Sequence, residues 1–309
     1  MSKSNEIISE VKKAIIGKEK ILVRVYLAII AGGHILIEDI PGVGKTTMAL
    51  AFSKALALDY NRMQFTPDVL PSDIVGFSVL NKSTGELEYK EGAIMCNLFL
   101  ADELNRATSR TQAALLEAME ENQVTVDGVT HPLPQPFTVI ATQNPIGAAG
   151  TQLLPDSQID RFMVKLSLGY PSEQNEIEML LRRQSGNPLS KLKQIVSIDE
   201  LNEIKAQADK IHIADSIFEY IVKLVGATRS NEFIQWGASP RASIAIASMA
   251  KAGAWVQGRD YIVPEDVRMF FHDCLAHRIK LTPEGEENNR GVKWALDNIL
   301  SKVKEPAIK

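Results

Sequence analysis

The architecture of this chain can be worked out from residues 34–50, His34-Ile-Leu-Ile-Glu-Asp-Ile-Pro-Gly-Val-Gly-Lys-Thr-Thr-Met-Ala-Leu50. An apolar strand over 34–38 runs into a glycine-rich loop, and we expect a helix from Thr47 onward. This order of strand, loop and helix is the one that a phosphate-binding P-loop requires. The segment therefore predicts a nucleotide site, with a glycine-rich turn that binds no ligand as the alternative.

Each residue type in the loop has a chemical reason to be there. Gly42 and Gly44 let the backbone turn its amides toward phosphates, and the new helix adds free amides and a positive dipole end. We expect Lys45 to reach the β- and γ-phosphates of ATP, and the hydroxyl of Thr46 to bind Mg²⁺. Asp39 stands where the usual P-loop signature has its first glycine. The other loop residues expected to contact the cofactor are Pro41, Val43 and Thr47.

A second segment supplies two acids. Residues 97–103 read Asn-Leu-Phe-Leu-Ala-Asp102-Glu103, an apolar strand that ends in adjacent carboxylates. Ligand sites of doubly wound sheets lie at the carboxyl ends of the strands. Asp102 is expected to bind Mg²⁺, mostly through water, and Glu103 to take a proton from the attacking water as general base. A solvated helix cap is the alternative for such a pair taken alone.

The chain is expected to divide into two domains, at 1–170 and 171–309. The first alternates apolar strands with amphipathic stretches, which is the pattern of an α/β domain with a parallel sheet. Hairpins are expected near 78–90 and 123–131, the second because Asp127-Gly128 favours a two-residue turn. The second domain shows only helical periodicity. The expected strands are 34–38, 63–65, 98–101, 137–142 and 162–166, and the expected helices of the second domain are 173–184, 198–209, 214–230, 241–256, 264–278 and 290–304.

The bulk composition disfavours several classes of protein. The chain has 309 residues, of which 45% are hydrophobic and 23% charged, as in ordinary globular proteins. Because it has neither the apolar core of a signal peptide at its start nor an apolar run long enough to span a membrane, we expect a cytoplasmic location. Cys96 and Cys274 are too few for a disulfide framework or a zinc site. A formal charge of -4 gives no electrostatic reason to expect nucleic acid as a partner.

Taken together, the motifs resemble the AAA+ ATPases, and within them the MoxR family, over nearly the whole chain. Residues 100–107, Leu-Ala-Asp-Glu-Leu-Asn-Arg-Ala, are similar to the extended Walker B motif of the family, and 64–76 to the segment after its second strand. Residues 141–145, Ala-Thr-Gln-Asn-Pro, 158–162, Gln-Ile-Asp-Arg-Phe, and 237–242, Gly-Ala-Ser-Pro-Arg-Ala, resemble its sensor 1, arginine-finger and sensor 2 segments. An acidic residue at position 39 also fits this family.

The resemblance implies an architecture and an assembly. The core would have a parallel sheet of strand order 5-1-4-3-2, followed by a smaller all-helical lid domain that carries sensor 2. The subunits would form a homo-oligomeric ring, expected to be a hexamer, with ATP between neighbours. Ile16 and Gly17 would pack beside the adenine through backbone contacts and apolar packing, with a plain amphipathic helix end as the alternative.

The resemblance also implies roles for four polar residues. Asn144, which leaves an apolar strand, would hold the attacking water or a γ-phosphate oxygen, unless it is only a turn residue. Arg161 would stabilise charge on a neighbour's γ-phosphate, with an exposed salt bridge as the alternative. Arg241 lies at a helix start, which disfavours a cation unless a phosphate is near, so we expect a phosphate contact from the lid, with a plain surface residue as the alternative. Arg106 either helps to transmit nucleotide state between subunits or forms a surface ion pair.

The implied function is ATP hydrolysis with Mg²⁺ that remodels or matures client proteins. Proteins of this family would be expected to act with partners of the von Willebrand factor A type. Two other functions stay open, an ATP-dependent binding switch or scaffold and a DNA-directed AAA+ protein. Glu103 argues against the switch, which needs no general base, and the absence of a basic stripe argues against DNA.

Overall fold

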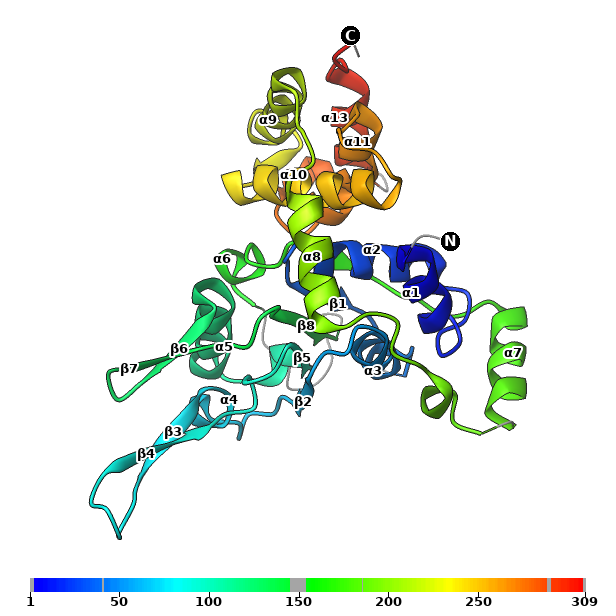
Figure 1. Cartoon of the computed structure of the whole chain (residues 1–309). Helices are drawn as coiled ribbons and strands as arrows, with labels where there is room; N and C mark the ends of the chain where they lie inside the picture. The colour runs from blue at the N-terminus through cyan, green and yellow to red at the C-terminus, as the bar shows by residue number, and fades with distance from the viewer. Residues whose placement is uncertain (1–2, 41, 145–153, 185, 288–289, 308–309) are drawn as a thin grey trace.

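A five-stranded parallel sheet forms the centre of the first half of the chain (Figure 1). The computed structural model describes residues 3–40, 42–144, 154–184, 186–287 and 290–307. The spatial order of the strands is β2-β5-β8-β1-β9. Numbered by their place in the core, this is 2-3-4-1-5, so the expected order 5-1-4-3-2 is confirmed. The strands are β1 (Ile35–Glu38), β2 (Tyr60–Gln64), β5 (Leu98–Asp102), β8 (Thr138–Gln143) and β9 (Val164–Leu166).

The central strands form where the sequence is most continuously apolar. Every residue of β5 and β8 is buried, as expected for strands that are covered on both faces. The expected strand 63–65 was misplaced, because the strand at that place is β2, Tyr60–Gln64. β2 lies at the edge of the sheet and carries polar, partly exposed residues such as Asn61 and Arg62, so no apolar run marks its start.

Helices cover both faces of the sheet. Ile35 and Ile37 of β1 pack into one apolar core with helices α1, α2 and α3, while Leu36 points to the other face and packs with α5. This alternation follows from the two-residue period of a strand. The helical elements of this half are α1 (Lys3–Val11), α2 (Glu19–Ile30), α3 (Lys45–Ala55), α4 (Pro71–Val75), η1 (Leu104–Arg106), α5 (Ser109–Glu121) and α6 (Asp156–Ile159).

Helix α3 begins two residues earlier than the expected Thr47. Its N-cap is Gly44, which has a φ of 97°, and Lys45 is its first helical residue. Glycine reaches this backbone conformation at little steric cost, so the turn into the helix is complete by Gly44. Lys45 and Thr46 therefore belong to the first turn of α3, where free amides point toward the loop.

Two hairpins leave the core on the side of α4 and α5 (Figure 1). One pairs β3 (Gly76–Leu80) with β4 (Leu87–Glu91), and the other pairs β6 (Gln123–Val126) with β7 (Val129–Pro132). Asp127 and Gly128 connect β6 and β7 with φ values of 50° and 79°, as a two-residue turn of this kind requires. The β3–β4 hairpin exposes apolar side chains, among them Phe77, Leu80 and Leu87.

The described part of the second half is helical, apart from a short pairing of β10 (Ile234–Trp236) with β11 (Lys280–Leu281) and an isolated bridge between His212 and Tyr261. Each of the expected helical segments of this half contains a helix. None of the helices in the described part of the chain is long and apolar enough to cross a membrane. The helical elements are α7 (Glu173–Gln184), η2 (Pro188–Lys191), α8 (Ile198–Asp209), α9 (Asp215–Arg229), α10 (Pro240–Val256), α11 (Pro264–Leu275), α12 (Pro283–Glu286) and α13 (Val292–Lys302).

Helix α7 has its polar and apolar faces reversed. Its partly buried residues are Asn175, Glu178 and Arg182, and Arg182 donates to the backbone carbonyls of residues 12 and 13. The opposite stripe carries Ile177, Leu180 and Leu181, which are more than half exposed. A surface helix normally turns such a stripe toward the core. We call this outward stripe the α7 apolar stripe.

Ala57 holds a left-handed backbone conformation, with a φ of 54°. It follows α3 in a Schellman motif, in which the amide of Leu58 donates to the carbonyl of Ser53 at 2.9 Å. Glycine is the usual residue there, because a Cβ in this conformation costs about 1–2 kcal/mol. Substitution of Ala57 by glycine should therefore remove this conformational cost.

We predict that Ala57→Gly raises the free energy of unfolding by about 0.5–1 kcal/mol, the relief of this strain less the entropy that glycine gains in the unfolded chain. The midpoint of urea denaturation measures the change. The matched control is Ala206→Gly, the same change at an exposed position inside α8. It should destabilise by about 1 kcal/mol. Equal losses at both positions would contradict the prediction.

Candidate functional site

The loop after β1 has the backbone of an anion site. Gly42 and Gly44 have φ values of 86° and 97°, which glycine adopts most readily. Lys45 is buried, with 7% of its surface exposed, and its Nζ donates to the carbonyl of Asp39 at 2.8 Å. Burial lowers the pKa of Lys45, and the nearby carboxylates of Asp102, Asp39 and Glu103 oppose that shift. Pro41 lies outside the described residues.

Asp39, the residue that departs from the P-loop signature, anchors the loop to the chain beyond β9. Its Oδ2 accepts hydrogen bonds from the amides of Leu168 at 2.5 Å and Gly169 at 2.7 Å, and from the hydroxyl of Ser167 at 3.2 Å. Hydrogen bonds from backbone amides and hydroxyl groups to an ionised carboxylate are stronger than those between neutral groups. The acid at this position therefore has a structural use, which the motif alone did not predict.

Asp102 ends β5 close to the loop. Its Oδ1 accepts from the hydroxyl of Thr142 at 2.6 Å, and its Oδ2 accepts from Nη2 of Arg62 at 2.7 Å. Sequence reasoning missed both partners. Thr142 could have been noticed as a polar residue near the end of an apolar strand, whereas Arg62 lies on the edge strand β2 with no motif around it.

Glu103 adopts a left-handed conformation, with φ 56° and ψ 45°, and its amide donates to the hydroxyl of Thr142 at 2.8 Å. Its Oε2 accepts from Nη1 of Arg106 at 2.8 Å, and its Oε1 accepts from Nδ2 of Asn144 at 3.0 Å. The hydrogen bond from Arg106 is the main cause that lowers the pKa of Glu103, and the one from Asn144 adds to it. The side chain is therefore ionised at neutral pH and able to accept a proton.

Asn144 lies directly after β8, and its Nδ2 donates to Glu103 at the end of β5. The amide oxygen Oδ1 of Asn144 is buried and has no hydrogen-bond partner among the described residues. A buried polar atom without a partner is costly and calls for an explanation, such as a water or a ligand. The structure thus brings the side chains of Glu103 and Asn144 together.

The oxygen donors here suit Mg²⁺. The hydroxyl of Thr46 and the carboxylate of Asp102 are the hard oxygen ligands that this ion prefers. No group of three or more His, Cys, Asp or Glu residues that could hold a metal occurs in the described part of the chain. Mg²⁺ commonly keeps several waters and binds through few protein ligands together with phosphates.

Ile16 and Gly17 lie beside hollows on the α7 side of the loop. One hollow of about 500 Å³ is lined by Ile16 and Thr47 together with Met179, and another of about 530 Å³ by Ile16 and Gly17 together with Asn175. A Cβ at Gly17, where φ is 68°, would lie 1.9 Å from Nδ2 of Asn175. Sequence reasoning missed Asn175 and Met179, because the pairing of α7 with this loop has no local signal.

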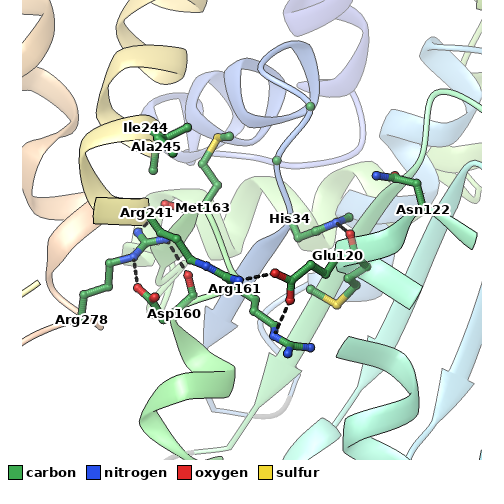
Figure 2. A pocket seen from close by; sticks show the side chains of 13 residues that line it. His34, Glu120, Asn122, Asp160, Arg161, Met163, Arg241, Ile244, Ala245 and Arg278 are labelled. Carbon is green, nitrogen blue, oxygen red and sulfur yellow. Dashed lines mark hydrogen bonds and ion pairs between the residues drawn. The ribbon is translucent and has the colours of Figure 1, made fainter. Parts of the chain in front are cut away.

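Arg161 and Arg241 meet at a second place, at the opposite end of β1. Nε of Arg161 lies 3.1 Å from Oε2 of Glu120, and Nη2 of Arg241 pairs with Oε1 of the same carboxylate (Figure 2). The hollow around them, about 290 Å³, is also lined by Gly33 and His34, which precede β1. The P-loop follows β1, so the structure places neither arginine at the P-loop of its own chain.

Comparisons with known proteins agree with this geometry. The family described as "ATPase family associated with various cellular activities (AAA)" matches residues 34–164, and the "AAA lid domain" matches residues 226–293. The chain is 42% identical to "Uncharacterized protein YeaC" of Bacillus subtilis, over 97% of this chain and 93% of the relative. It is 37% identical to "Chaperone MoxR1" of Mycobacterium tuberculosis, over 97% and 82%. A crystal structure of a putative ATPase from Cytophaga hutchinsonii matches with a TM-score of 0.91 and 40% identity, over 99% and 95%.

Proposed function

The chain belongs to the MoxR family of AAA+ ATPases, and from this premise we propose that it hydrolyses ATP with Mg²⁺ to remodel or mature partner proteins. The observation that carries the proposal is the meeting of Lys45, Asp102 and Glu103 at the carboxyl ends of β1 and β5. A cation for phosphate, a ligand for the metal and an ionised base are what hydrolysis of ATP needs. The proposed domains are a core at 1–170 and a lid at 171–309.

Each residue has a defined task in the proposed reaction. Lys45 and the amides at the start of α3 bind the phosphates, and Thr46 and Asp102 hold Mg²⁺, which neutralises phosphate charge when bound. Glu103 accepts the proton of the attacking water. Asn144 Oδ1, which has no partner among the residues that the structure describes, supports its role in holding that water, because its Nδ2 already donates to Glu103. Ile16 and Gly17 border the hollows in which we place the adenine.

Arg106 is proposed to hold Glu103 in its ionised form and in a fixed position. Its Nη1 contacts Oε2 of Glu103 at 2.8 Å, so Arg106 forms an ion pair, and both side chains of this pair are partly exposed. This contact fixes the carboxylate in its charged form, and Asn144 fixes its orientation from the other oxygen. Transmission of nucleotide state between subunits by Arg106 stays a prediction.

The positions of Arg161 and Arg241 support a ring in which neighbours share active sites. Both lie at the amino end of β1, so a phosphate contact requires the nucleotide of another subunit. The α7 apolar stripe, next to the hollows beside the P-loop, supports a covering neighbour as well. We propose a homo-oligomeric ring, expected to be a hexamer. Client proteins would meet exposed apolar residues of the β3–β4 hairpin, and a von Willebrand factor A-type partner stays a prediction.

We predict that Arg161→Ala lowers ATP turnover by about 10³-fold, because an arginine finger contributes roughly 10³–10⁵ to the rate. Mixed assemblies of Arg161→Ala and Lys45→Ala chains should regain part of the activity. In those assemblies an intact P-loop lies next to an intact finger. Co-expression with two different tags and purification over both gives the mixed assemblies, in which turnover is measured.

The control for this experiment is Arg110→Ala, a change at an exposed arginine on α5. It should leave turnover unchanged. Full activity of Arg161→Ala at every protein concentration would refute the sharing of sites between neighbours.

A further inference from the structure

Glu120 joins a core residue to a lid residue. It lies in the last turn of α5, and its two carboxylate oxygens contact different guanidinium groups, Arg161 of the core and Arg241 at the start of α10 (Figure 2). The Arg161 contact uses Nε, and its two terminal nitrogens have no hydrogen-bond partner among the described residues. Glu120 therefore contacts two arginines, and it contacts Arg161 through Nε rather than through the two terminal nitrogens of the guanidinium group.

A second carboxylate ties the same two segments together. Asp160, next to Arg161, accepts from the hydroxyl of Ser239 at 2.8 Å and from Nε of Arg278 at 2.8 Å. Ser239 is the N-cap of α10 and so fixes the start of the helix that carries Arg241. Arg278 also donates to the carbonyl of Phe162 at 2.7 Å, and its side chain is only 2% exposed.

The charges of this group favour an anion. Asp160 and Arg278 neutralise each other, and Glu120 neutralises one of the two remaining arginines, which leaves one net positive charge. Arg161, Arg241 and Glu120 are all partly exposed, with 30% to 43% of their side-chain surface accessible. Guanidinium groups bind phosphate through several parallel hydrogen bonds, so an exposed pair held at fixed spacing suits a terminal phosphate group.

We propose that Glu120 is a positioning residue that sets Arg161 and Arg241 as one two-pronged phosphate clamp for the nucleotide of the neighbouring subunit. Asp160 ties the core segment that carries Arg161 to the start of α10, which carries Arg241, through its hydrogen bond from Ser239, and Arg278 holds Asp160 in place. The lid of each chain then moves with the finger that touches the neighbour's ATP. This inference rests on the proposed shared active site, and it adds a residue and a lid connection that the motifs did not contain.

The variant Glu120→Gln tests this proposal. Glutamine has the size of glutamate, but its single amide oxygen accepts from one arginine while its NH₂ group repels the other. Turnover in the assembled protein should fall about tenfold, less than for loss of Arg161 itself. The KM for ATP should change less than about twofold, because the P-loop of the same chain is intact. The matched control is Glu121→Gln, the same loss of charge at the exposed neighbouring position, which should keep full turnover.

Mixed assemblies separate positioning from a defect in folding. Glu120→Gln chains co-assembled with Lys45→Ala chains should regain turnover, because the intact Glu120 then lies beside the intact P-loop. Turnover of Glu120→Gln equal to that of Glu121→Gln would overturn the proposal, and so would a loss that Lys45→Ala chains do not restore. Arg161→Ala is measured alongside. If it keeps full activity, the shared active site itself fails, which is a different outcome from a failure of Glu120 alone.

Discussion

Glu103→Gln is expected to lower ATP turnover by roughly 10²–10⁴, the usual contribution of a positioned general base. Glutamine keeps the size and a hydrogen-bond acceptor of the side chain but cannot take a proton at neutral pH. Nucleotide affinity should hold or rise, because Lys45 and Asp102 keep their contacts and a negative charge near the phosphates is lost. Single-turnover hydrolysis and ATP binding, measured at one Mg²⁺ concentration, give both quantities.

Two further variants serve as comparisons for Glu103→Gln. Asp102→Asn should weaken Mg²⁺-dependent binding as well as turnover, because Asp102 is the proposed metal ligand. Glu117→Gln, at an exposed position on α5, should change neither. If Glu103→Gln turns over at the wild-type rate, its assignment as general base is wrong, and an ATP-dependent binding switch becomes the better interpretation.

Lys45→Ala should abolish measurable nucleotide binding. The carboxylates of Asp39, Asp102 and Glu103 lie near the ammonium group of Lys45. Loss of the ammonium group therefore leaves three negative charges near the proposed triphosphate site. A hydrogen bond to a charged group contributes about 1.5–3 kcal/mol, which is roughly a tenfold to a hundredfold change in affinity before repulsion is added. Isothermal titration calorimetry with ATP and Mg²⁺ measures it.

The control for that measurement lies on the same helix. Lys54, near the end of α3, is exposed and its Nζ donates to the carbonyl of Leu189. Lys54→Ala removes the same charge away from the loop and should leave ATP affinity unchanged. Equal affinity of wild type and Lys45→Ala would exclude this loop as the phosphate site.

The sequence predicted the fold well where apolar runs or turn residues mark an element. The buried strand β5 follows the apolar run 98–101, and the hairpin turn at Asp127-Gly128 follows from the positive φ angles that those residues adopt. The start of β2 could not be predicted in this way, because an edge strand is held by hydrogen bonds to its neighbour and needs few apolar side chains. The hydrophobic periodicity that predicts other strands is therefore missing from an edge strand such as β2.

The site was predicted only as far as its motifs reach. Lys45, Asp102 and Glu103 are recognisable because the chemistry requires them at a loop or a strand end. The partners that set their geometry are distant in sequence, such as Arg62 for Asp102 and Thr142 for Glu103. Glu120 has no motif at all, and only the packing of the lid against the core brings it to Arg241. Side-chain contacts of this range depend on the three-dimensional fold, which local patterns do not contain.

Glu103 and Ala57 share a left-handed backbone that side chains other than glycine, asparagine and aspartate rarely adopt. At Ala57 no proposed function opposes a change to glycine, and a laboratory selection for heat resistance should find it. At Glu103 the same selection, applied without a demand for activity, would favour replacement by a residue that tolerates this angle. Glu103 thus occupies this position at a conformational cost on the order of 1 kcal/mol. Engineering of this protein for thermal stability should therefore keep position 103 fixed, because thermal screening alone would select variants that lack the proposed general base.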